Sequence, residues 1–238
     1  MPFRKLFKNH KYLNEIEEIE HEFKSETNDD KTEITIYGII GSSWWGESTS
    51  ASDVKGVLKN NESKEIIVNL NSGGGDAFDG IAIYNQLKKH DAKIIVNVDG
   101  FAASAASVIA MAADELIMNT GTMLMIHEAS TFTWGTKKEV KATLNALEGL
   151  DSSLADIYMT RFKGERSEIE TFIENETWFT ASEAVDLGLA DSMNEFNNED
   201  EEDPEEFKNN VLARFRSKEP QKIVASTNNI LQQFKRQN

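Results

Sequence analysis

The sequence has no cysteine and only three prolines among its 238 residues. The absence of cysteine excludes disulfide bonds, thiol nucleophiles and cysteine-ligated zinc. No apolar stretch reaches the roughly 18 residues that a membrane-spanning helix needs. The basic segment Met1–His10 is not followed by the apolar core of a signal peptide. We therefore expect a cytoplasmic protein without a membrane partner.

Positive charge is also scarce. The sequence has 25 lysines and arginines and 41 aspartates and glutamates, which gives a formal net charge of −16. This balance argues against nucleic acid as a partner. Residues 195–206 hold eight acidic residues and no basic one, which is typical of a solvated linker. We predict a charged N-terminal arm over 1–30, a folded domain over 31–194, and an acidic linker with a disordered or partly helical tail over 195–238.

Between the arm and the tail, strand patterns alternate with helix patterns. Apolar β-type runs occupy 34–40, 65–70, 93–98, 115–118 and 123–126, and helical patterns occupy 50–54, 76–90, 104–113 and 180–187. This order predicts an α/β fold with a mainly parallel sheet covered by helices on its faces. A long amphipathic pattern over 137–162 predicts a helix that either projects toward another subunit or packs on its own core.

Ser104 stands at a predicted strand-to-helix junction, in a segment (Gly100–Ser107) whose small residues leave its hydroxyl uncovered. A serine there could attack a carbonyl, and the next backbone N–H could hold the resulting oxyanion. A closely packed core helix explains the same composition. His127 ends a predicted strand, where functional residues of parallel sheets gather, and its imidazole can take a proton from a hydroxyl near neutral pH. A structural histidine is the alternative.

Three glycines follow the second predicted strand, in the segment Asn71–Asp76 (Asn-Ser-Gly-Gly-Gly-Asp). Glycine allows a ligand to approach the backbone closely. Phosphate binding is disfavoured, because the spacing matches no phosphate-binding motif and Asp76 and Asp79 would repel the anion. An oxyanion donor or a docking edge for an extended peptide fits better, and a plain flexible turn is the alternative.

Four motifs in order resemble the Clp protease proteolytic subunit family, serine peptidases that share a fold with crotonases. They are Asn71–Gly75, Gly100–Ser104, Met125–His127 and Thr180–Asp191. The likeness runs from about Ile34 to Met193. It implies a ClpP/crotonase-like α/β fold of repeated β-β-α and β-α units, with a mainly parallel sheet and a long projecting helix. It also implies a serine-type endopeptidase that needs no metal and no cofactor.

Carried over by position, the resemblance implies a catalytic triad. Ser104 becomes the nucleophile and His127 the base. The third position holds Glu176, where the family usually has aspartate, and a glutamate can orient the histidine in such triads. Its extra methylene changes the geometry, so Asn175 and Glu174 remain alternatives for this role.

The resemblance also assigns the substrate-binding backbone. The N–H groups of Gly75 and Ala105 would hold the oxyanion, with Gly74 in the same loop. Two positions depart from the family pattern. Gly73 replaces the usual proline, which loosens the loop that should bind the substrate backbone, and Phe101 replaces a common glutamine.

Assembly and biological role are also implied by the resemblance. The family forms homo-oligomeric rings, often heptameric and sometimes stacked in pairs, which would place the 137–162 helix at the contact between rings, with an unfoldase partner left open. The acidic tail makes the chain look most like Clp-related head maturation proteases of tailed phages, which cut capsid and scaffold proteins in the prohead within the host cytoplasm. A non-catalytic capsid-assembly or scaffold protein and a crotonase-type acyl-CoA enzyme are the alternatives.

Overall fold

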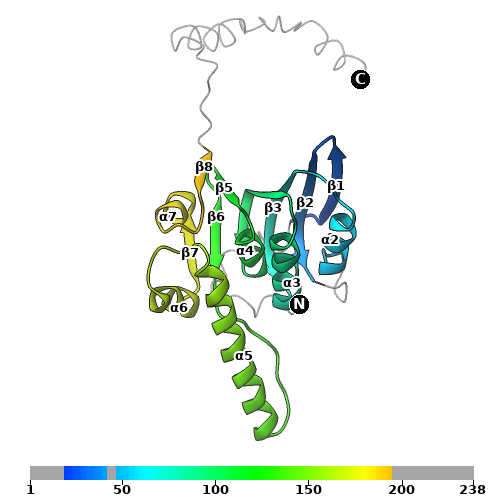
Figure 1. The fold of residues 1–238 in the computed structure, drawn as a ribbon. Helices are drawn as coiled ribbons and strands as arrows, with labels where there is room; N and C mark the ends of the chain where they lie inside the picture. Colours follow the sequence, from blue (N-terminus) through cyan, green and yellow to red (C-terminus); the bar gives the residue numbers. More distant parts are fainter. Residues whose placement is uncertain (1–18, 42–46, 195–238) are drawn as a thin grey trace, which may run out of the picture. The chain divides into compact units, whose positions relative to one another are not determined.

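The computed structural model describes residues 19–41 and 47–194, and their framework is a mostly parallel sheet (Figure 1). The order is β1-β2-β3-β4-β5-β8, and β6 pairs with β4 and with β7. The pairs β1/β2 and β6/β7 are antiparallel and the rest are parallel. The strands are β1 (Glu22–Asn28), β2 (Lys31–Ile40), β3 (Glu65–Gly75), β4 (Lys93–Ala103), β5 (Glu115–Asn119), β6 (Met123–Ile126), β7 (Thr177–Thr180) and β8 (Ser192–Asn194).

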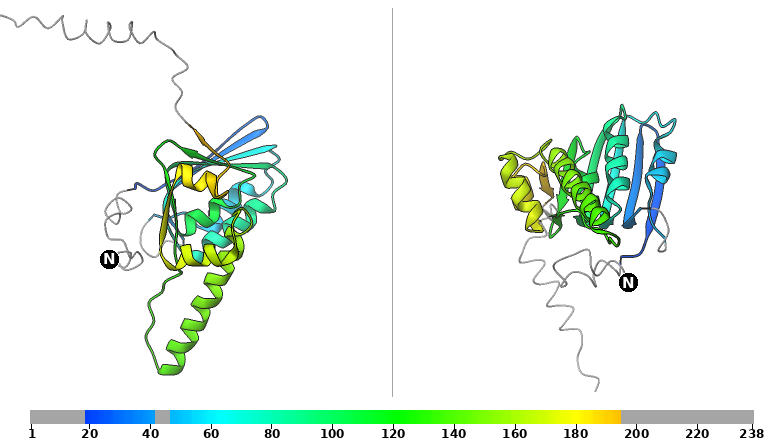
Figure 2. Two further views of the ribbon diagram at one scale, coloured as in Figure 1. Left: turned by 90° about the vertical axis from the view of Figure 1, so that its left-hand side faces the viewer. Right: turned by 90° about the horizontal axis from the view of Figure 1, so that it is seen from below.

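Four of the described helices, α2, α3, α5 and α7, begin at side chains that cap their free N–H groups. Ser50, Thr136 and Thr180 each form a capping box, and Asp76 accepts two backbone N–H groups at the start of α3. Figures 1 and 2 show α2, α3 and α4 against the same face of the sheet. The helices are α2 (Ala51–Leu58), α3 (Ala77–Lys88), α4 (Ala105–Ala110), α5 (Lys137–Tyr158), α6 (Arg166–Glu174) and α7 (Ala181–Asp186). The predicted α/β fold is confirmed.

The core lies between the sheet and these helices. Every second residue of the central strands is buried there, as the 0% exposure of Val68 and Val96 illustrates. The alternate positions are half-buried or exposed and carry polar cross-strand contacts. Asn97 Nδ2 donates to Asn69 Oδ1 at 3.0 Å. The prediction of helices on the sheet's faces holds for the face that these helices cover. In the described residues the other face carries polar side chains together with the half-buried Ile67, Ile95 and Ile117.

The sheet begins inside the segment predicted as the N-terminal arm, which corrects the boundary at residue 30. β1 pairs with β2 from Glu22↔Tyr37 to Asn28↔Lys31, around a turn in which Asp29 has φ 50°. Its side chains are mostly polar and exposed, a pattern that suits an edge strand and conceals it from a search for apolar runs. The predicted tail over 195–238 lies outside the described residues.

The long helix α5 combines the two interpretations of its sequence pattern. Its N-terminal part extends away from the sheet (Figure 1), and Val140 and Leu144 are 42% and 54% exposed there. Its C-terminal part packs on the core through Leu154 and Tyr158. Among the described residues, no helix combines the length and apolar character that crossing a bilayer requires.

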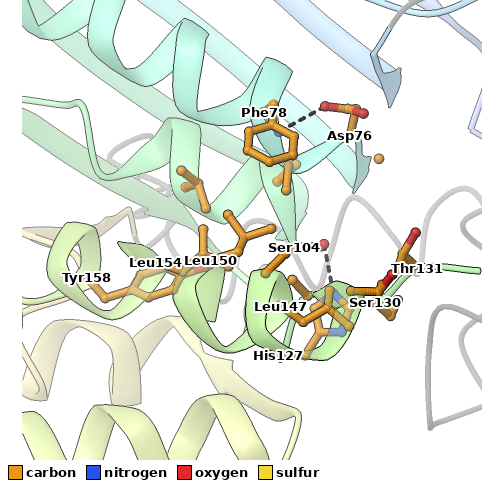
Figure 3. Close-up of a pocket in the computed structure, with 17 residues that line it drawn as sticks. Asp76, Phe78, Ser104, His127, Ser130, Thr131, Leu147, Leu150, Leu154 and Tyr158 are labelled. Atoms are coloured by element: carbon orange, nitrogen blue, oxygen red, sulfur yellow. Dashed lines mark hydrogen bonds between the residues drawn. The ribbon is translucent and has the colours of Figure 1, made fainter. Parts of the chain in front are cut away.

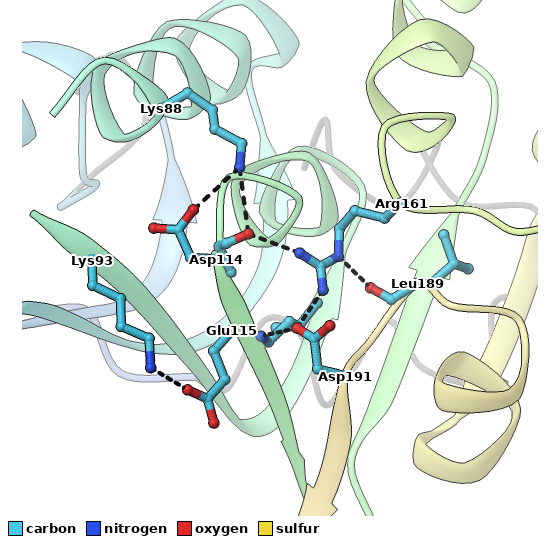
Figure 4. Close-up of polar contacts among 9 residues, drawn as sticks. Lys88, Lys93, Asp114, Glu115, Arg161, Leu189 and Asp191 are labelled. Carbon is cyan, nitrogen blue, oxygen red and sulfur yellow. Dashed lines mark hydrogen bonds and ion pairs between the residues drawn. The ribbon is translucent and has the colours of Figure 1, made fainter. Parts of the chain in front are cut away.

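Arg161, just beyond α5, attaches this helix to the sheet (Figure 4). Its guanidinium donates to the carbonyls of Ala113 at 2.8 Å and Leu189 at 3.1 Å, and it pairs with Asp191. The Asp191 carboxylate also accepts the Leu116 N–H at 2.6 Å. Hydrogen bonds to charged groups are among the stronger ones in proteins. The end of α5 is thereby fixed to the segments that flank α4, β5 and β8.

Candidate active site

The candidate site lies at the end of β4, beyond the point where this strand changes partners. Its first half pairs with β5 and its second half, Phe101–Ala103, pairs with β6. The Ser104 N–H then donates to the Met125 carbonyl at 3.0 Å, which continues the β4–β6 ladder by one residue. His127 follows two residues after Met125. The parallel pairing therefore brings Ser104 and His127 to the same edge of the sheet, as the sequence predicted for strand ends.

Ser104 itself makes the turn between β4 and α4. Its backbone angles are φ 57° and ψ −123°, a region that residues other than glycine rarely adopt. The flanking residues Ala103 and Ala105 are small and buried. Because the chain reverses direction on this one residue, the Ser104 side chain stands out from the backbone at the edge of a pocket (Figure 3).

The hydroxyl of Ser104 meets the imidazole of His127. The distance between His127 Nε2 and Ser104 Oγ is 2.8 Å (Figure 3). This is within the reach that a general base needs to take a proton. In the tautomer that can accept this proton, Nε2 is unprotonated and Nδ1 carries the hydrogen. Two side chains 23 positions apart thus form the nucleophile–base geometry of an acyl-transfer site.

Glu176 and His127 lie just beyond the paired ends of β7 and β6. The antiparallel pairing ends with Ile126 opposite Thr177, so His127 follows one strand of this last pair and Glu176, in a turn with φ 49°, precedes the other. Asn175 caps the end of α6, and its side-chain amide donates back to the Thr171 carbonyl at 2.9 Å. Of the three residues that the sequence offered for the third position, Glu176 is the one that directly adjoins the last β6–β7 pair, as His127 does on the other strand.

The glycine loop, residues Asn71–Asp76, lies against the Ser104 backbone at Gly74. A Cβ on Gly74 would stand 2.7 Å from Ser104 Cβ and 2.8 Å from the Ala105 nitrogen, and a Cβ on Gly75 would stand 2.0 Å from the Ile40 carbonyl oxygen. Gly74 and Gly75 have φ 89° and 151°. Only glycine fits such close approaches at these angles. The glycines thus allow close packing against the protein's own backbone, and the approach of a ligand to this loop stays a prediction.

The loop is also held by hydrogen bonds of its own. Ser72 Oγ accepts the Gly74 N–H at 3.0 Å and donates to the Gly38 carbonyl at 2.6 Å. Ser72 is completely buried. The Gly74 N–H is thus used to shape the loop, which makes Gly74 a packing residue against Ser104 and leaves the Gly75 N–H as the loop's candidate oxyanion donor.

An apolar pocket of about 280 Å³ opens beside Ser104 (Figure 3). Phe78, which is 70% exposed, lines it from the start of α3. The opposite wall comes from Leu147, Leu150 and Leu154 on α5. The sequence revealed these leucines as a helical stripe but assigned them to the core or to a subunit contact. Their place beside Ser104 depends on how α5 packs, which spacing alone does not determine.

Asp151 on α5 supports the chain just after His127. Its carboxylate accepts the Ala129 N–H at 2.7 Å. Burial raises the pKa of Asp151 above its ordinary value, and the nearby Glu128 raises it further. The helix that lines the pocket therefore also holds the segment that carries the imidazole.

Comparison with known proteins relates this chain to one protein family. A family model described as "Clp protease" matches residues 49–196. The chain is 31% identical over 137 residues to the ATP-dependent Clp protease proteolytic subunit 1 of Chlamydia abortus, covering 56% of this chain and 71% of that protein. It is 28% identical over 132 residues to proteolytic subunit 3 of Rhodococcus jostii, covering 55% and 65%. A mutant ClpP1 structure from Listeria monocytogenes shares the fold, with TM-score 0.56 and 24% identity over 70% of this chain and 92% of that chain.

Replacing Gly75 by alanine tests the close packing of the glycine loop. We expect Gly75→Ala to lower the free energy of unfolding by about 3 kcal/mol or more, because the new Cβ meets a backbone oxygen that cannot move cheaply. The matched control is Gly56→Ala in α2, where a Cβ meets nothing within 4 Å. That variant should gain about 0.5–1 kcal/mol from helix propensity. Urea unfolding measures both, and equal effects would contradict the account.

Proposed function

The chain belongs to the Clp protease family, and on that premise we propose that it is a serine endopeptidase with Ser104 as its nucleophile. The observation that carries the proposal is the 2.8 Å contact between Ser104 Oγ and His127 Nε2 at the mouth of an apolar pocket. Family membership accounts for peptidase activity in general. The Ser–His pair supplies the particular chemistry, because it couples a nucleophile to a base.

The proposed reaction follows from the atoms in the site. Ser104 Oγ attacks the peptide carbonyl while its proton passes to His127 Nε2. The oxyanion of the tetrahedral intermediate accepts hydrogen bonds from the N–H groups of Gly75 and Ala105. When the intermediate collapses, the C–N bond breaks, the leaving amine takes the proton from Nε2, and the acyl-enzyme remains. Water then attacks the ester, again with His127 as base, and releases the acid.

Glu176 has an orienting role in this proposal. A carboxylate beside the imidazole holds the tautomer with hydrogen on Nδ1 and stabilises the imidazolium that forms in each step. The β6–β7 pairing supports this assignment, because it ends at Ile126 and Thr177, the residues that directly adjoin His127 and Glu176.

Two other functions fit the fold less well. A crotonase-type acyl-CoA enzyme uses oxyanion-hole amides but requires no serine–histidine pair, so the Ser104–His127 contact favours the peptidase. A non-catalytic capsid-assembly or scaffold protein would keep the fold with an unreactive Ser104. Chemical labelling of the serine separates that function from catalysis.

Assembly into a homo-oligomeric ring, as a heptamer or a stacked pair of rings, is part of the proposal. The exposed part of α5 and the segment before it present Phe132 and Trp134, which are 85% and 95% exposed. Val140 and Leu144 add to this apolar surface. Large exposed apolar side chains mark contact surfaces, which supports an interface between subunits here. Processing of capsid or scaffold proteins stays a prediction, because it rests on residues 195–238, outside the described part.

Labelling with a fluorophosphonate tests the nucleophile. We expect intact-mass analysis to show one phosphonyl adduct on the native chain and none on Ser104→Ala, because the label reacts with an activated serine. Ser130→Ala is the matched control, since Ser130 lines the same pocket and its loss should leave the adduct in place. An adduct that persists in Ser104→Ala, or none on the native chain, would refute the proposal.

Substitution of Glu176 tests the third member of the triad. We expect Glu176→Gln to lower kcat on a fluorogenic peptide by about 10²–10⁴-fold, because the amide no longer stabilises the imidazolium. Glu176→Asp, which restores the family's usual residue, should stay within about tenfold of the native rate. Glu174→Gln, two positions away, should leave the rate unchanged. A loss in Glu174→Gln with an active Glu176→Gln would transfer the role to Glu174.

A further inference from the structure

The carbonyl of Ser104 is the end of a buried hydrogen-bond chain that comes from α5. Ser107 Oγ lies 2.6 Å from this carbonyl oxygen and donates to it. The same Oγ lies 2.8 Å from the Tyr158 hydroxyl. Because a serine hydroxyl has one hydrogen, and Ser107 uses it on the carbonyl, the Tyr158 hydroxyl must donate to Ser107 Oγ. The chain therefore runs from Tyr158 through Ser107 to Ser104, across 51 positions of sequence.

Both intermediate groups are shut away from water. Ser107 is 0% and Tyr158 1% exposed. Burial raises the pKa of the Tyr158 hydroxyl far above its ordinary value, so the phenol keeps its hydrogen and remains a donor at any pH at which a protease works. A buried hydroxyl without a partner costs free energy, and here both have one, because Ser107 donates to the Ser104 carbonyl and Tyr158 donates to Ser107.

The carbonyl that these residues hold shares a peptide group with the Ala105 N–H. A peptide group is planar and trans, so its C=O and N–H point in opposite directions. Fixing the Ser104 carbonyl toward Ser107 therefore fixes the Ala105 N–H on the other side of the same plane. Ala105 is the first residue of α4, and its N–H has no carbonyl partner within the helix.

The fixation matters because this peptide group follows a residue in an unfavourable conformation. Ser104 has φ 57° and ψ −123°, and rotation of the peptide group would relieve the strain. The Val108 N–H also reaches the Ser104 carbonyl, but at 3.3 Å, which is longer than the 2.6 Å contact from Ser107. Of the two contacts that hold the carbonyl, the hydrogen bond from the Ser107 hydroxyl is thus the shorter.

We propose that Ser107 and Tyr158 are positioning residues, which hold the Ser104–Ala105 peptide group so that the Ala105 N–H faces the oxyanion. The proposal rests on the proposed serine-peptidase function. The hydrogen-bond chain from Tyr158 through Ser107 also polarises the peptide group. A carbonyl that accepts hydrogen bonds makes the N–H of the same group a stronger donor. Neither hydroxyl contacts the reacting atoms, so both act through the backbone of the nucleophile.

The test compares Ser107→Ala, Tyr158→Phe and the double variant in the full chain. Measured quantities are kcat and KM on a fluorogenic peptide, and the affinity for a peptide aldehyde, whose serine adduct carries an oxyanion. We expect Ser107→Ala to lower kcat by about 10–100-fold, and Tyr158→Phe by about 3–10-fold, with KM changed less than about twofold. Aldehyde affinity should fall in parallel with kcat/KM, since both report on the oxyanion site.

Matched controls remove a similar hydroxyl elsewhere. Ser153→Ala takes away an exposed α5 hydroxyl that bonds the Gly149 carbonyl at 2.9 Å, and Tyr84→Phe takes away a phenol on α3. Neither should change kcat. If Ser107→Ala fails to fold because the Tyr158 hydroxyl loses its partner, Tyr158→Phe carries the test, since it leaves no unpaired donor. The double variant should be no slower than Ser107→Ala, because the two hydroxyls act in series.

The outcomes distinguish a failure of the proposed peptidase function from a failure of the positioning role of Ser107 and Tyr158. A native chain that neither takes up fluorophosphonate nor cleaves peptide overturns the proposed function, and the positioning role with it. An active native chain whose Ser107→Ala and Tyr158→Phe variants match the controls in kcat and aldehyde affinity overturns the positioning role alone. A loss of kcat that is fully explained by a smaller folded fraction, measured by urea unfolding, also overturns it.

Discussion

Ser104 holds a backbone conformation that costs a residue other than glycine about 1–3 kcal/mol, and contacts from three directions keep it there. Its N–H is bound to the Met125 carbonyl in the neighbouring strand. Its carbonyl is bound to Ser107. Gly74 packs against its Cβ so closely that a side chain would not fit. The sheet, the following helix and the glycine loop therefore hold Ser104 in its strained conformation, and this conformation presents the hydroxyl.

β4 divides its pairing between two partners before the chain turns at Ser104. The strand pairs with β5 as far as Val98 and with β6 from Phe101 to Ala103. α4 then starts immediately, among alanines small enough to let it lie close under the strand ends. His127, the proposed base, directly follows β6, and Glu176 directly precedes β7, the strand that pairs with β6. One change of strand partner thus assembles the three proposed triad members.

Helix α5 connects the pocket with both proposed catalytic side chains. Leu147 and Leu150 line the pocket, and Asp151 holds the segment after His127. Tyr158 reaches the Ser104 carbonyl through Ser107. Arg161 then fixes the end of the helix to the carbonyl of Ala113 and to Asp191. The same helix carries the exposed Val140 and Leu144 at its other end.

Much of this arrangement could be predicted from the sequence, because the motifs around Ser104 and His127 lie at strand ends that a parallel sheet brings together. The apolar runs predicted the strands, and the three consecutive glycines predicted the loop that follows the second of them. β1 was not predicted, because an exposed edge strand with polar side chains carries no apolar run. The hydroxyl chain could not be predicted either. Ser107 and Tyr158 look like a small core residue and a stripe residue, and only tertiary packing shows that their oxygens meet.

The central claim is that the Ser104 turn aims a hydroxyl at the carbon, and a backbone N–H at the oxygen, of one reacting carbonyl group. A crystal structure with a peptide boronic acid tests it most directly. The account predicts boron bonded to Ser104 Oγ, with one boronate oxygen accepting hydrogen bonds from the N–H groups of Gly75 and Ala105. Ser104 should keep its positive φ, and Ser107 Oγ should still donate to its carbonyl. Boron bonded elsewhere, or a boronate oxygen directed away from both N–H groups, would contradict it.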